Sequence, residues 1–308
     1  MWGGVPEITV LTPVFNRRIE LKRCMDSVKK QTFRNFEYII VNDGSTENID
    51  GLVNEFMSTV SFPVMYIKKD NGGVHTARNL GIQYARGEML AMIDSDDELI
   101  PYALETFISI WKSIPDKSKF CQVRCCCQDQ NGNLVGDSFP ENINSVSWKI
   151  RKKICHKTKG EKYGFHVTQI MKDNPWPEPD GITFVTENIL WLKLDKSYDS
   201  YMINDMLRIY HTETEISYTN KKKVTFQYLK NLAWNQVYQL NDPGIYSYTL
   251  TDDFWRCAIY CVADRILRMI RDPVEIKVRL YRHKILCWCL KIPAIVVAHV
   301  YAKKNKIM

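Results

Sequence analysis

Residues 90–99, LAMIDSDDEL, join a short apolar run to four carboxylates, Asp94, Asp96, Asp97 and Glu98, within five residues. These carboxylates repel one another, so a fold that gathers them at a strand end usually does so to hold a cation. The apolar residues before them have the composition of a buried strand. We therefore expect a strand that ends in a cation site, and we interpret the rest of the chain around that point.

Three further units of strand, loop and helix precede this stretch. The predicted strands cover residues 8–14, 36–41 and 63–68, and each is followed by a polar loop and then by apolar residues at helical spacing. With a fourth strand at 88–93, this alternation predicts an α/β fold in which helices wrap a mostly parallel, Rossmann-like sheet. Ligands of such folds bind outside the carboxyl ends of the strands.

Four polar loops follow the four strands, at residues 13–17, 42–46, 71–73 and 94–98. Any one of them alone is explained equally well as an ordinary turn. Because all four follow successive strands at the same edge of the predicted sheet, we interpret them together as one ligand site.

The composition is that of a large folded protein. The chain has 308 residues, of which 45% are hydrophobic and 12% aromatic, so disorder and low complexity are excluded. The start lacks the charged, apolar and small-residue order of a signal peptide, and we expect a cytoplasmic protein. Three of the ten cysteines are consecutive, at 125–127, which favours reduced, buried thiols over disulfides. The sequence contains no C-x-x-C pair, which argues against structural zinc.

The net charge of +7 is distributed unevenly along the chain. It is −4 over residues 1–105, +1 over 106–218 and +10 over 219–308. An acidic first part and a basic, aromatic last part indicate a metal site in the former and an anionic surface partner for the latter.

Four motifs, in their order and spacing, resemble the family-two glycosyltransferases of the bacterial polysaccharide type. They are TPVFNR at 12–17, VNDGSTE at 41–47, NGGVHTARNLGIQYARGE at 71–88 and MIDSDDEL at 92–99. The close resemblance covers about the first third of the chain, and a weaker one extends to about residue 218. It implies a GT-A fold whose first half, 1–105, binds a nucleotide-sugar and whose second half, 106–218, binds the acceptor. A helical, basic extension, 219–308, follows.

The resemblance also implies the chemistry. A divalent cation, Mn²⁺ or Mg²⁺, would neutralise the leaving diphosphate while a sugar passes to an acceptor hydroxyl with inversion. The resemblance assigns Asp96 to the metal and Asp94 to the nucleotide and the metal. Asp43 would accept the imide N–H of a uracil ring, which favours a UDP-sugar. The implied nucleotide-binding residues are Thr12, Pro13, Phe15, Asn16, Asp43, Gly73, Arg78, Asn79, Asp94 and Ser95.

Three assignments keep an alternative. Asp97 contacts the water of the metal or the sugar, or it joins Glu98 in capping the helix expected from about Pro101. Arg78 contacts phosphate or ribose, or it is a plain surface or sheet-capping arginine. His211 is a metal ligand by the resemblance, or it is a structural histidine.

Inverting transfer also needs a general base on the face opposite the leaving group. In the resembled family this base is a carboxylate at a helix start, often in a Glu-Asp pair. Here the pair is Glu187-Asn188, so we expect Glu187 to be the catalytic base. The alternative is that Thr186 or Glu187 only caps the helix.

The middle of the chain carries weaker signals. Residues 119–128 and 134–139 flank a turn sequence and are expected to pair as a hairpin that contains the three cysteines. The lysine-rich residues 146–163 are expected to form a mobile basic segment, either a lid over acceptor or phosphate or a solvated charge run. Asp205 is expected to lie in a turn.

The last third is expected to be helical. Apolar spacing predicts helices over about 226–240, 254–270 and 285–301, and the last is too short and too interrupted to span a membrane. Basic residues flank this last helix, which either lies in an anionic membrane interface or packs on the catalytic domain or a second subunit. The membrane interpretation suits a lipid-linked acceptor at the inner face of the cytoplasmic membrane.

These features together predict a metal-dependent inverting glycosyltransferase that acts on a glycan or lipid-linked glycan, as a monomer or a homo-oligomer. The alternative is a nucleotide-sugar-binding module of the same fold without turnover, because Asn188 stands where a second acid is usual. The basic last third carries no nucleic-acid motif, and we expect no nucleic-acid partner. A nucleotidyltransferase would need a glycine-rich phosphate loop with Lys or Arg near the N-terminus, which this sequence does not have.

Overall fold

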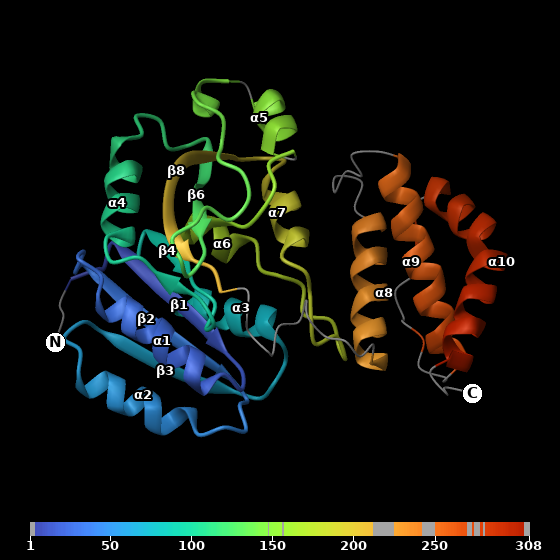
Figure 1. The fold of residues 1–308 in the computed structure, drawn as a ribbon, viewed down its shortest axis with the longest axis horizontal. Helices are drawn as coiled ribbons and strands as arrows, with labels where there is room; N and C mark the ends of the chain where they lie inside the picture. Colours follow the sequence, from blue (N-terminus) through green and yellow to red (C-terminus); the bar gives the residue numbers. More distant parts are fainter. Residues whose placement is uncertain are drawn as a thin grey trace. The chain divides into compact units, whose positions relative to one another are not determined.

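The computed structural model describes residues 4–146, 148–155, 157–211, 225–241, 250–269, 273, 278–279 and 281–304 (Figure 1). The chain divides into two compact units. Unit 1 comprises Met1–Pro175 and Ser197–Glu215, and unit 2 comprises Trp176–Lys196 and Ile216–Met308. The two halves predicted for the GT-A domain therefore lie largely in unit 1, and the predicted helical extension lies in unit 2.

A sheet of eight strands, counted over the described residues, forms the centre of unit 1 in the order β3-β2-β1-β4-β7-β6-β8-β5. The strands are β1 Ile8–Val14, β2 Phe36–Asp43, β3 Val64–Lys69, β4 Met89–Met92, β5 Glu98–Leu99, β6 Phe120–Gln128, β7 Lys162–Val167 and β8 Asp199–Ile209. β1 to β4 are parallel, as are β6 and β8. β7 runs antiparallel to β4 and β6, and β5 runs antiparallel to β8. The predicted α/β class is confirmed, and the sheet as a whole is mixed.

Helices cover both faces of the parallel part, which explains why every residue of β1 and β2 is buried. The apolar stripes of α1 (Arg18–Lys29), α2 (Ile49–Ser58) and α4 (Ala103–Ser113) share one core with alternate residues of the strands. α3 (Val74–Tyr84) packs on the other face of β1 and β2 and contacts α6 (Thr168–Asp173). The core thus fixes where each strand ends, and the polar loops follow at those ends.

The predicted hairpin of β6 is correct only next to its turn. Asp129 and Val135 donate backbone N–H groups to the carbonyls of Asn133 and Cys127, and Leu134 bridges Gln128. The rest of β6 pairs with β7 and β8 instead. Phe139 and Ile143 lie outside the sheet and pack against Cys126 on one face of β6. The two neighbouring cysteines of the triplet face the main core, so the predicted alternation and burial of the three thiols are confirmed.

The described residues between 146 and 163 include a helix and the start of a strand that the sequence did not predict. They contain α5 (Trp148–Cys155) and lead into β7, and the 3₁₀ turn η1 (Ile143–Ser145) precedes them. Arg151 is buried, forms an ion pair with Asp199 at 3.1 Å and donates to three backbone carbonyls of residues 143–146. Asp205 lies within β8, in a bulge, and not in the predicted turn. Arg151 and Asp205 take these positions through contacts with residues far away in the sequence, and such contacts leave no local pattern.

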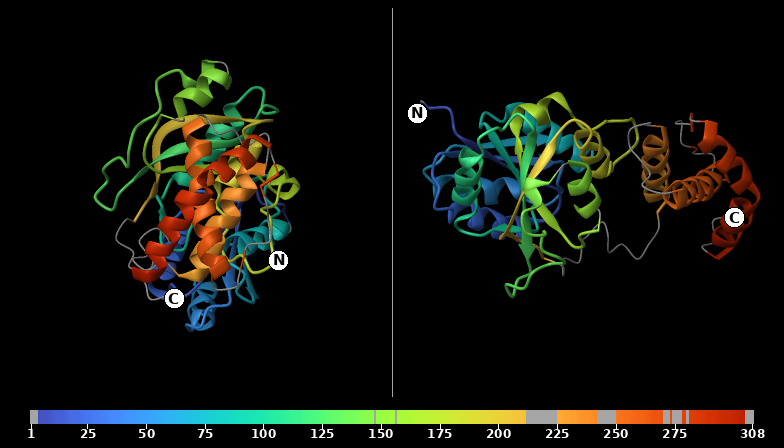
Figure 2. Two further views of the ribbon diagram at one scale, coloured as in Figure 1. Left: turned by 90° about the vertical axis from the view of Figure 1, so that its right-hand side faces the viewer. Right: turned by 90° about the horizontal axis from the view of Figure 1, so that it is seen from above.

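Unit 2 is helical in its described parts. It contains α7 (Asn188–Leu194), α8 (Phe226–Asn241), α9 (Leu250–Met269) and α10 (Tyr281–Lys304), and Figure 2 shows α8, α9 and α10 side by side. The three predicted C-terminal helices are confirmed. No described helix combines the length and the apolar character needed to cross a bilayer.

Candidate metal and nucleotide site

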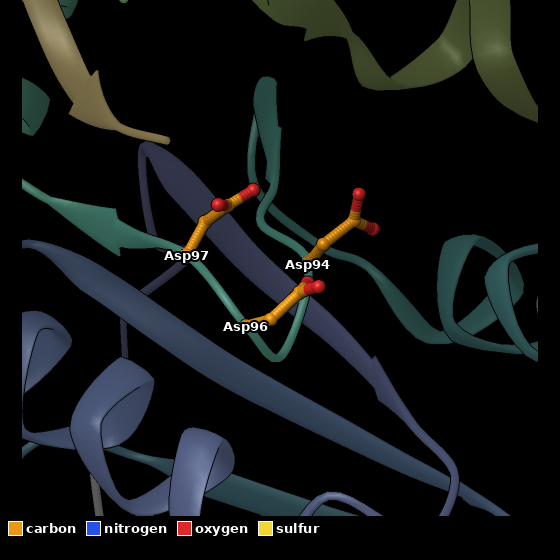
Figure 3. Close-up of side chains that lie close together, drawn as sticks. All are labelled: Asp94, Asp96 and Asp97. Atoms are coloured by element: carbon orange, nitrogen blue, oxygen red, sulfur yellow. The ribbon is translucent and has the colours of Figure 1, made fainter. Parts of the chain in front are cut away.

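The three aspartates of the opening stretch lie on the loop that joins β4 to β5 (Figure 3). One carboxylate oxygen of each lies within 4.8 Å of the others. The loop begins beside the end of β1, where the N–H of Ile93 donates to the carbonyl of Leu11 at 2.9 Å. It then turns sharply, with the N–H of Asp97 donating to the carbonyl of Asp94 at 3.0 Å. The parallel sheet therefore delivers all three carboxylates to one point.

Each aspartate has its own arginine, and the three arginines come from three different parts of unit 1. Asp94 contacts Arg78 of α3 at 2.6 Å, and Asp96 contacts Arg17 of the loop after β1 at 2.6 Å. Asp97 accepts two N–H groups of Arg208 in β8, the one from Nε at 2.8 Å. The structure thus assembles an alternating cluster of carboxylates and guanidinium groups at the sheet edge.

Burial and mutual repulsion set the proton affinities of these carboxylates. Burial acts to raise the pKa of Asp94, but nearby guanidinium groups, Arg78 first, outweigh it and hold the pKa below its ordinary value. Burial and the Asp94 carboxylate raise the pKa of Asp96. Burial raises the pKa of Asp97 to about 7. A further cation would therefore be favoured at Asp94 and Asp96, because it would relieve the repulsion between them.

Asp97 and Glu98 do not cap the following helix, so that alternative is wrong. α4 begins at Ala103 with Tyr102 at its N-cap, whereas Glu98 opens the short strand β5. Asp97 is 1% exposed and uses both oxygens, one for Arg208 and one for the backbone N–H of His211 at 3.1 Å. Pairing with β8 decides the position of these two acids, and that pairing overrides the local preference for a cap.

His211 lies next to the acidic cluster but is held by another group. Its Nε2 lies 2.8 Å from Oε1 of Glu98, and Arg23 of α1 reaches the same carboxylate at 3.4 Å. Among the described residues, the group of three carboxylates within 4.8 Å does not include His211. Its predicted role as a metal ligand stays a prediction.

Asp43 organises the loop that starts α3. Its carboxylate is buried and accepts from Lys69 Nζ at 2.6 Å, Gly72 N–H at 3.0 Å and Gly73 N–H at 2.8 Å. Gly73 takes φ +96°, which a side chain would oppose, and α3 follows directly. Asp43 therefore fixes the start of the helix that carries Arg78. The predicted contact with a uracil ring stays a prediction.

Asn16 joins the first two polar loops. Its backbone takes φ 49°, and its Oδ1 accepts the N–H groups of Thr46 at 2.8 Å and Glu47 at 3.3 Å. Ser45 Oγ accepts the N–H of Asn16 at 3.0 Å in return. Phe15, just before it, is 45% exposed. The two loops thus form one surface with an aromatic ring at its rim.

The other predicted nucleotide-binding residues lie at the same edge of the sheet. Thr12 is fully buried and accepts the hydroxyl of Tyr38 at 3.0 Å, and Pro13 pairs with Val41 of β2. Asn79 and Ser95 are buried as well, on α3 and on the acidic loop. Thr12 and Pro13 can therefore offer a ligand only their backbone or the shape that they give to the loop.

Glu187 lies in unit 2, at the first turn of α7. It occupies the N-cap position with helical backbone angles, and its side chain makes no capping hydrogen bond. Its carbonyl accepts from Leu190 at 3.0 Å and Trp191 at 3.1 Å, the first hydrogen bonds of the helix. The structure therefore does not support the alternative in which the Glu187 side chain caps α7.

Sequence reasoning missed two residues of the cluster. Arg17 stands within the TPVFNR motif, directly after the predicted nucleotide residues, and this position was a usable signal. Arg208 has no local signal, because it reaches Asp97 from 111 residues further along the chain.

The carboxylate cluster fits a hard divalent cation. Carboxylate oxygens are the ligands that Mg²⁺ and Mn²⁺ prefer, and two of them leave coordination positions for phosphate oxygens and water. Asp97 is the poorest candidate ligand, because Arg208 and a backbone N–H already use both of its oxygens. Asp94 and Asp96 are thus the residues that would hold the ion.

Solved structures similar to this chain share its fold at low identity. S. aureus TarS (residues 1–349), solved in complex with UDP-GlcNAc, superposes with a TM-score of 0.62 and 16% identity over 97% of this chain and 92% of that chain. The mannosyltransferase PcManGT from Pyrobaculum calidifontis, in complex with GDP-Man and Mn²⁺, gives a TM-score of 0.57 and 14% identity, covering 99% of this chain and 89% of that one. The predicted GT-A fold is confirmed by this likeness.

The two sequence relatives below each match about a third of the chain. Glycosyltransferase GlyA of Streptococcus pneumoniae is 38% identical over 100 residues, which are 32% of this chain and 14% of that protein. Glycosyltransferase GlyG of the same organism is 35% identical over 99 residues, which are 32% of this chain and 33% of that protein. The chain thus matches a third or less of the length of these relatives. Residues 9–170, more than half of the chain, match the family described as Glycosyl transferase family 2, and the chain belongs to that family.

Proposed function

We propose that this chain is a metal-dependent inverting glycosyltransferase. It takes a sugar from a nucleotide-diphosphate sugar, of the UDP type, and transfers it to a hydroxyl of a glycan or lipid-linked glycan. The observation that carries the proposal is the cluster of Asp94, Asp96 and Asp97 at the carboxyl edge of a parallel sheet. The nucleotide-sugars named with TarS and PcManGT, and the Mn²⁺ named with the latter, support it.

The acidic cluster serves the leaving diphosphate. Asp94 and Asp96 would hold Mn²⁺ or Mg²⁺, which supplies Lewis-acid neutralisation of the departing phosphate charge. Arg17 and Arg78 already lie against these carboxylates at 2.6 Å. Their planar guanidinium groups match phosphate as well as they match carboxylate, so we propose that both turn to the diphosphate when the donor binds.

The two joined loops serve the nucleoside. Phe15 offers an exposed ring on which a base can stack, and Asn16 holds that loop against residues 45–47. Asp43 is the proposed reader of the uracil imide. It also holds the N–H of Gly73, the N-cap of the helix α3 that carries Asn79. Thr12, Pro13 and Ser95 shape the floor of the same surface.

Glu187 is the proposed general base. Its carboxylate takes the proton of the acceptor hydroxyl, the oxygen attacks the anomeric carbon, and the bond from that carbon to the diphosphate oxygen breaks on the opposite face. Configuration at the anomeric carbon is therefore inverted. Asn188 cannot take a proton in this way, so the role falls on Glu187 alone within the pair.

A screen of nucleotide-sugars tests the proposal. Thermal shift and donor hydrolysis are measured for UDP- and GDP-sugars, each with Mn²⁺, Mg²⁺ or EDTA. We expect one UDP-sugar to stabilise the chain and to be hydrolysed slowly, both only with metal, and D96N to abolish both effects. D173N, which changes an exposed carboxylate of α6 bonded to Gln169, is the matched control. Failure of every donor to bind with either metal would refute the proposal.

A second variant separates catalysis from binding. E187Q keeps the size of the side chain and removes its basicity, so donor binding should persist while transfer to an acceptor falls at least about 100-fold. Undiminished transfer by E187Q would exclude this base. Binding without turnover by the wild-type chain, with every donor and acceptor, would instead favour a binding module.

A further inference from the structure

One side of α10 carries exposed apolar side chains that the helical packing of unit 2 does not use. Ile285, Trp288 and Ile295 are 47%, 68% and 40% exposed. Their spacing of three and seven residues puts them on one side of the helix. Single exposed apolar side chains are normal on a protein surface, whereas several that lie together mark an interaction surface.

The opposite side of α10 is the one that packs on α9. Sγ of Cys257 lies 3.9 Å from the carbonyl of His283, and Sγ of Cys261 lies 3.7 Å from the carbonyl of Cys287. His283, Ala294 and Ala298 are buried. The stripe of Ile285, Trp288 and Ile295 therefore faces away from α9 within unit 2, and the 52% exposed Val297 lies on another side of α10.

The charge beside the stripe has one sign. Lys284 and Lys291 are exposed and lie one turn to either side of Trp288. The sequence of α10, Tyr281–Lys304, contains no acidic residue, and none occurs after Glu275. The stripe is thus bordered by cations that no carboxylate on the same helix neutralises, and its chemical complement is an anionic surface.

We propose that α10 lies along an anionic phospholipid surface, with Ile285, Trp288 and Ile295 at the depth of the headgroups and Lys284 and Lys291 on lipid phosphates. A tryptophan with an apolar body and one polar N–H suits that depth. The helix is about 36 Å long at 1.5 Å per residue, and Pro293 and the lysines interrupt its apolar character, so it lies on the bilayer and does not span it. Membrane binding by α10 does not depend on the proposed function. Only its purpose, access to a lipid-linked acceptor, rests on that function.

A second copy of the chain is a poorer occupant of the same stripe. In a two-fold symmetric contact each surface meets itself, so the lysines of one copy would lie near those of the other. With no carboxylate on α10 to separate them, this arrangement would bury like charges together. Charge complementarity therefore favours the lipid surface.

Vesicle flotation of the 308-residue chain tests the inference. The probes are vesicles of phosphatidylcholine alone and of phosphatidylcholine with 30% phosphatidylglycerol, at low and at high salt. We expect binding to the anionic vesicles at low salt, at least tenfold weaker binding to neutral ones, and weakening by salt. K284Q/K291Q should lose about 25-fold in partitioning, at about fivefold for each lysine removed.

The apolar part is tested with a matched pair of tryptophans. W288S should reduce partitioning at least tenfold, whereas W255S, which changes a 64% exposed tryptophan of α9, should leave it unchanged. Bromine-labelled lipid should quench part of the wild-type tryptophan fluorescence, and that part should be missing in W288F. Circular dichroism confirms that each variant keeps its helices.

Three outcomes would overturn the inference: no binding to anionic vesicles at low salt, equal loss in W255S and W288S, or a dimer in solution that W288S dissociates while vesicles are ignored. Metal-dependent donor hydrolysis in solution is measured on the same samples. If W288S hydrolyses donor normally, failure of membrane binding leaves the proposed function intact. If the chain binds vesicles but hydrolyses no donor, the proposed function is refuted and the membrane inference stands.

Discussion

The guanidinium group of Arg208 holds Asp97 inside unit 1. Arg208 is 8% exposed and Asp97 1% exposed, and the Cζ atom of Arg208 lies 5.5 Å from the ring of Tyr163 and 5.2 Å from that of Tyr210. The same carboxylate accepts the N–H of His211 and so fixes the end of β8 beside the acidic loop. A buried pair of this kind adds little net stability, but loss of one partner leaves the other charged and unsolvated.

Removal of the arginine should therefore be severe. We expect R208Q to lower the free energy of unfolding by about 3–5 kcal/mol, because it leaves the Asp97 carboxylate buried without its cation. Urea unfolding measures this loss. The double variant D97N/R208Q should be more stable than R208Q alone, since both charges are then gone. Strictly additive losses in the two single variants would show that the pair does not act as a unit.

His75 gives unit 1 a specific sensitivity to acid. It is 1% exposed on α3, and neither ring nitrogen has a hydrogen-bond partner among the described residues. Burial lowers its pKa from 6.5 to about 4, with Lys69 and Arg78 acting in the same direction and Asp43 opposing them. Above pH 6.5 the ring is neutral in both states. Below it the unfolded chain takes up the proton first, so stability falls as the pH drops from 6.5 towards 4.

Substitution of His75 tests this sign. At pH 4.5 the histidine should cost about 2.5 kcal/mol relative to pH 7.5, which corresponds to about 5–10 °C in melting temperature for a unit of this size. H75F removes the titrating group at similar volume, so its advantage over the wild type should grow by that amount on acidification. Thermal melts at both pH values measure the difference. An advantage that does not depend on pH would show that packing and not protonation is responsible.

At the level of single residues, the sequence is informative where function needs a local motif. Asp94 and Asp96 stand two apart at the end of an apolar run, and this pattern alone placed them together. The sequence leaves Asp97 open between a contact with the metal's water or the sugar and a helix cap, and the contact with Arg208 has no local signal that could replace either. A residue whose partner lies 111 positions away has no signature in its own neighbourhood.

At the level of elements, the turn into β4 positions the acidic loop. Gly87 donates to Oγ1 of Thr9 at 2.9 Å, and β1 runs so close that a Cβ on Gly87 would lie 2.4 Å from the nitrogen of Thr9. Backbone atoms of a central strand cannot move aside as a side chain can. The glycine therefore permits β4 to lie against β1 with Asp94 at its end.

Alanine at this glycine should shift the strand. We expect G87A to cost about 2–3 kcal/mol in urea unfolding, because the new methyl group overlaps the backbone of β1. G4A is the control, since nothing lies within 4 Å of the position that its Cβ would take. Metal binding should weaken in G87A as well, because β4 carries the aspartates. Equal stability of the two variants would mean that β4 can shift without cost.

The elements themselves divide by the range of their contacts. β1 to β4 and their helices repeat a local pattern, and the sequence predicted all of them. β7 was hidden in a lysine-rich segment, because Lys162 opens it and a glycine stands at its centre. β8 contains two consecutive polar or charged positions after Ile203, Asn204 and Asp205, where a bulge interrupts its pairing. Strands that pair with distant partners need no regular alternation of their own, so periodicity cannot find them.

At the scale of the molecule, the charge changes at residue 219, and the longer segment of unit 2 begins nearby, at Ile216. The inclusion of residues 176–196 in unit 2 was not predictable, because it depends on two buried asparagines of α8. Asn231 accepts the N–H of Thr183 at 3.0 Å, and Asn235 accepts that of Thr186 at 2.9 Å. These amides replace the backbone partners that an irregular segment lacks. The residue proposed as the base is therefore carried by the helical unit.

Metal binding should act on unit 1 alone. The carboxylates that would hold the ion all lie between β4 and β5, so Mn²⁺ at 100 times its dissociation constant should stabilise unit 1 by about 2.7 kcal/mol. Hydrogen exchange followed by mass spectrometry resolves where this occurs: amides of β4, β5 and the end of β8 should exchange more slowly with metal, while those of α8, α9 and α10 should not change. D96N should lose the response and D173N should keep it, because only the former removes a carboxylate of the cluster. Equal protection of α8 to α10 would mean that the metal acts on both units, and protection confined to them would place the cation site outside the acidic loop.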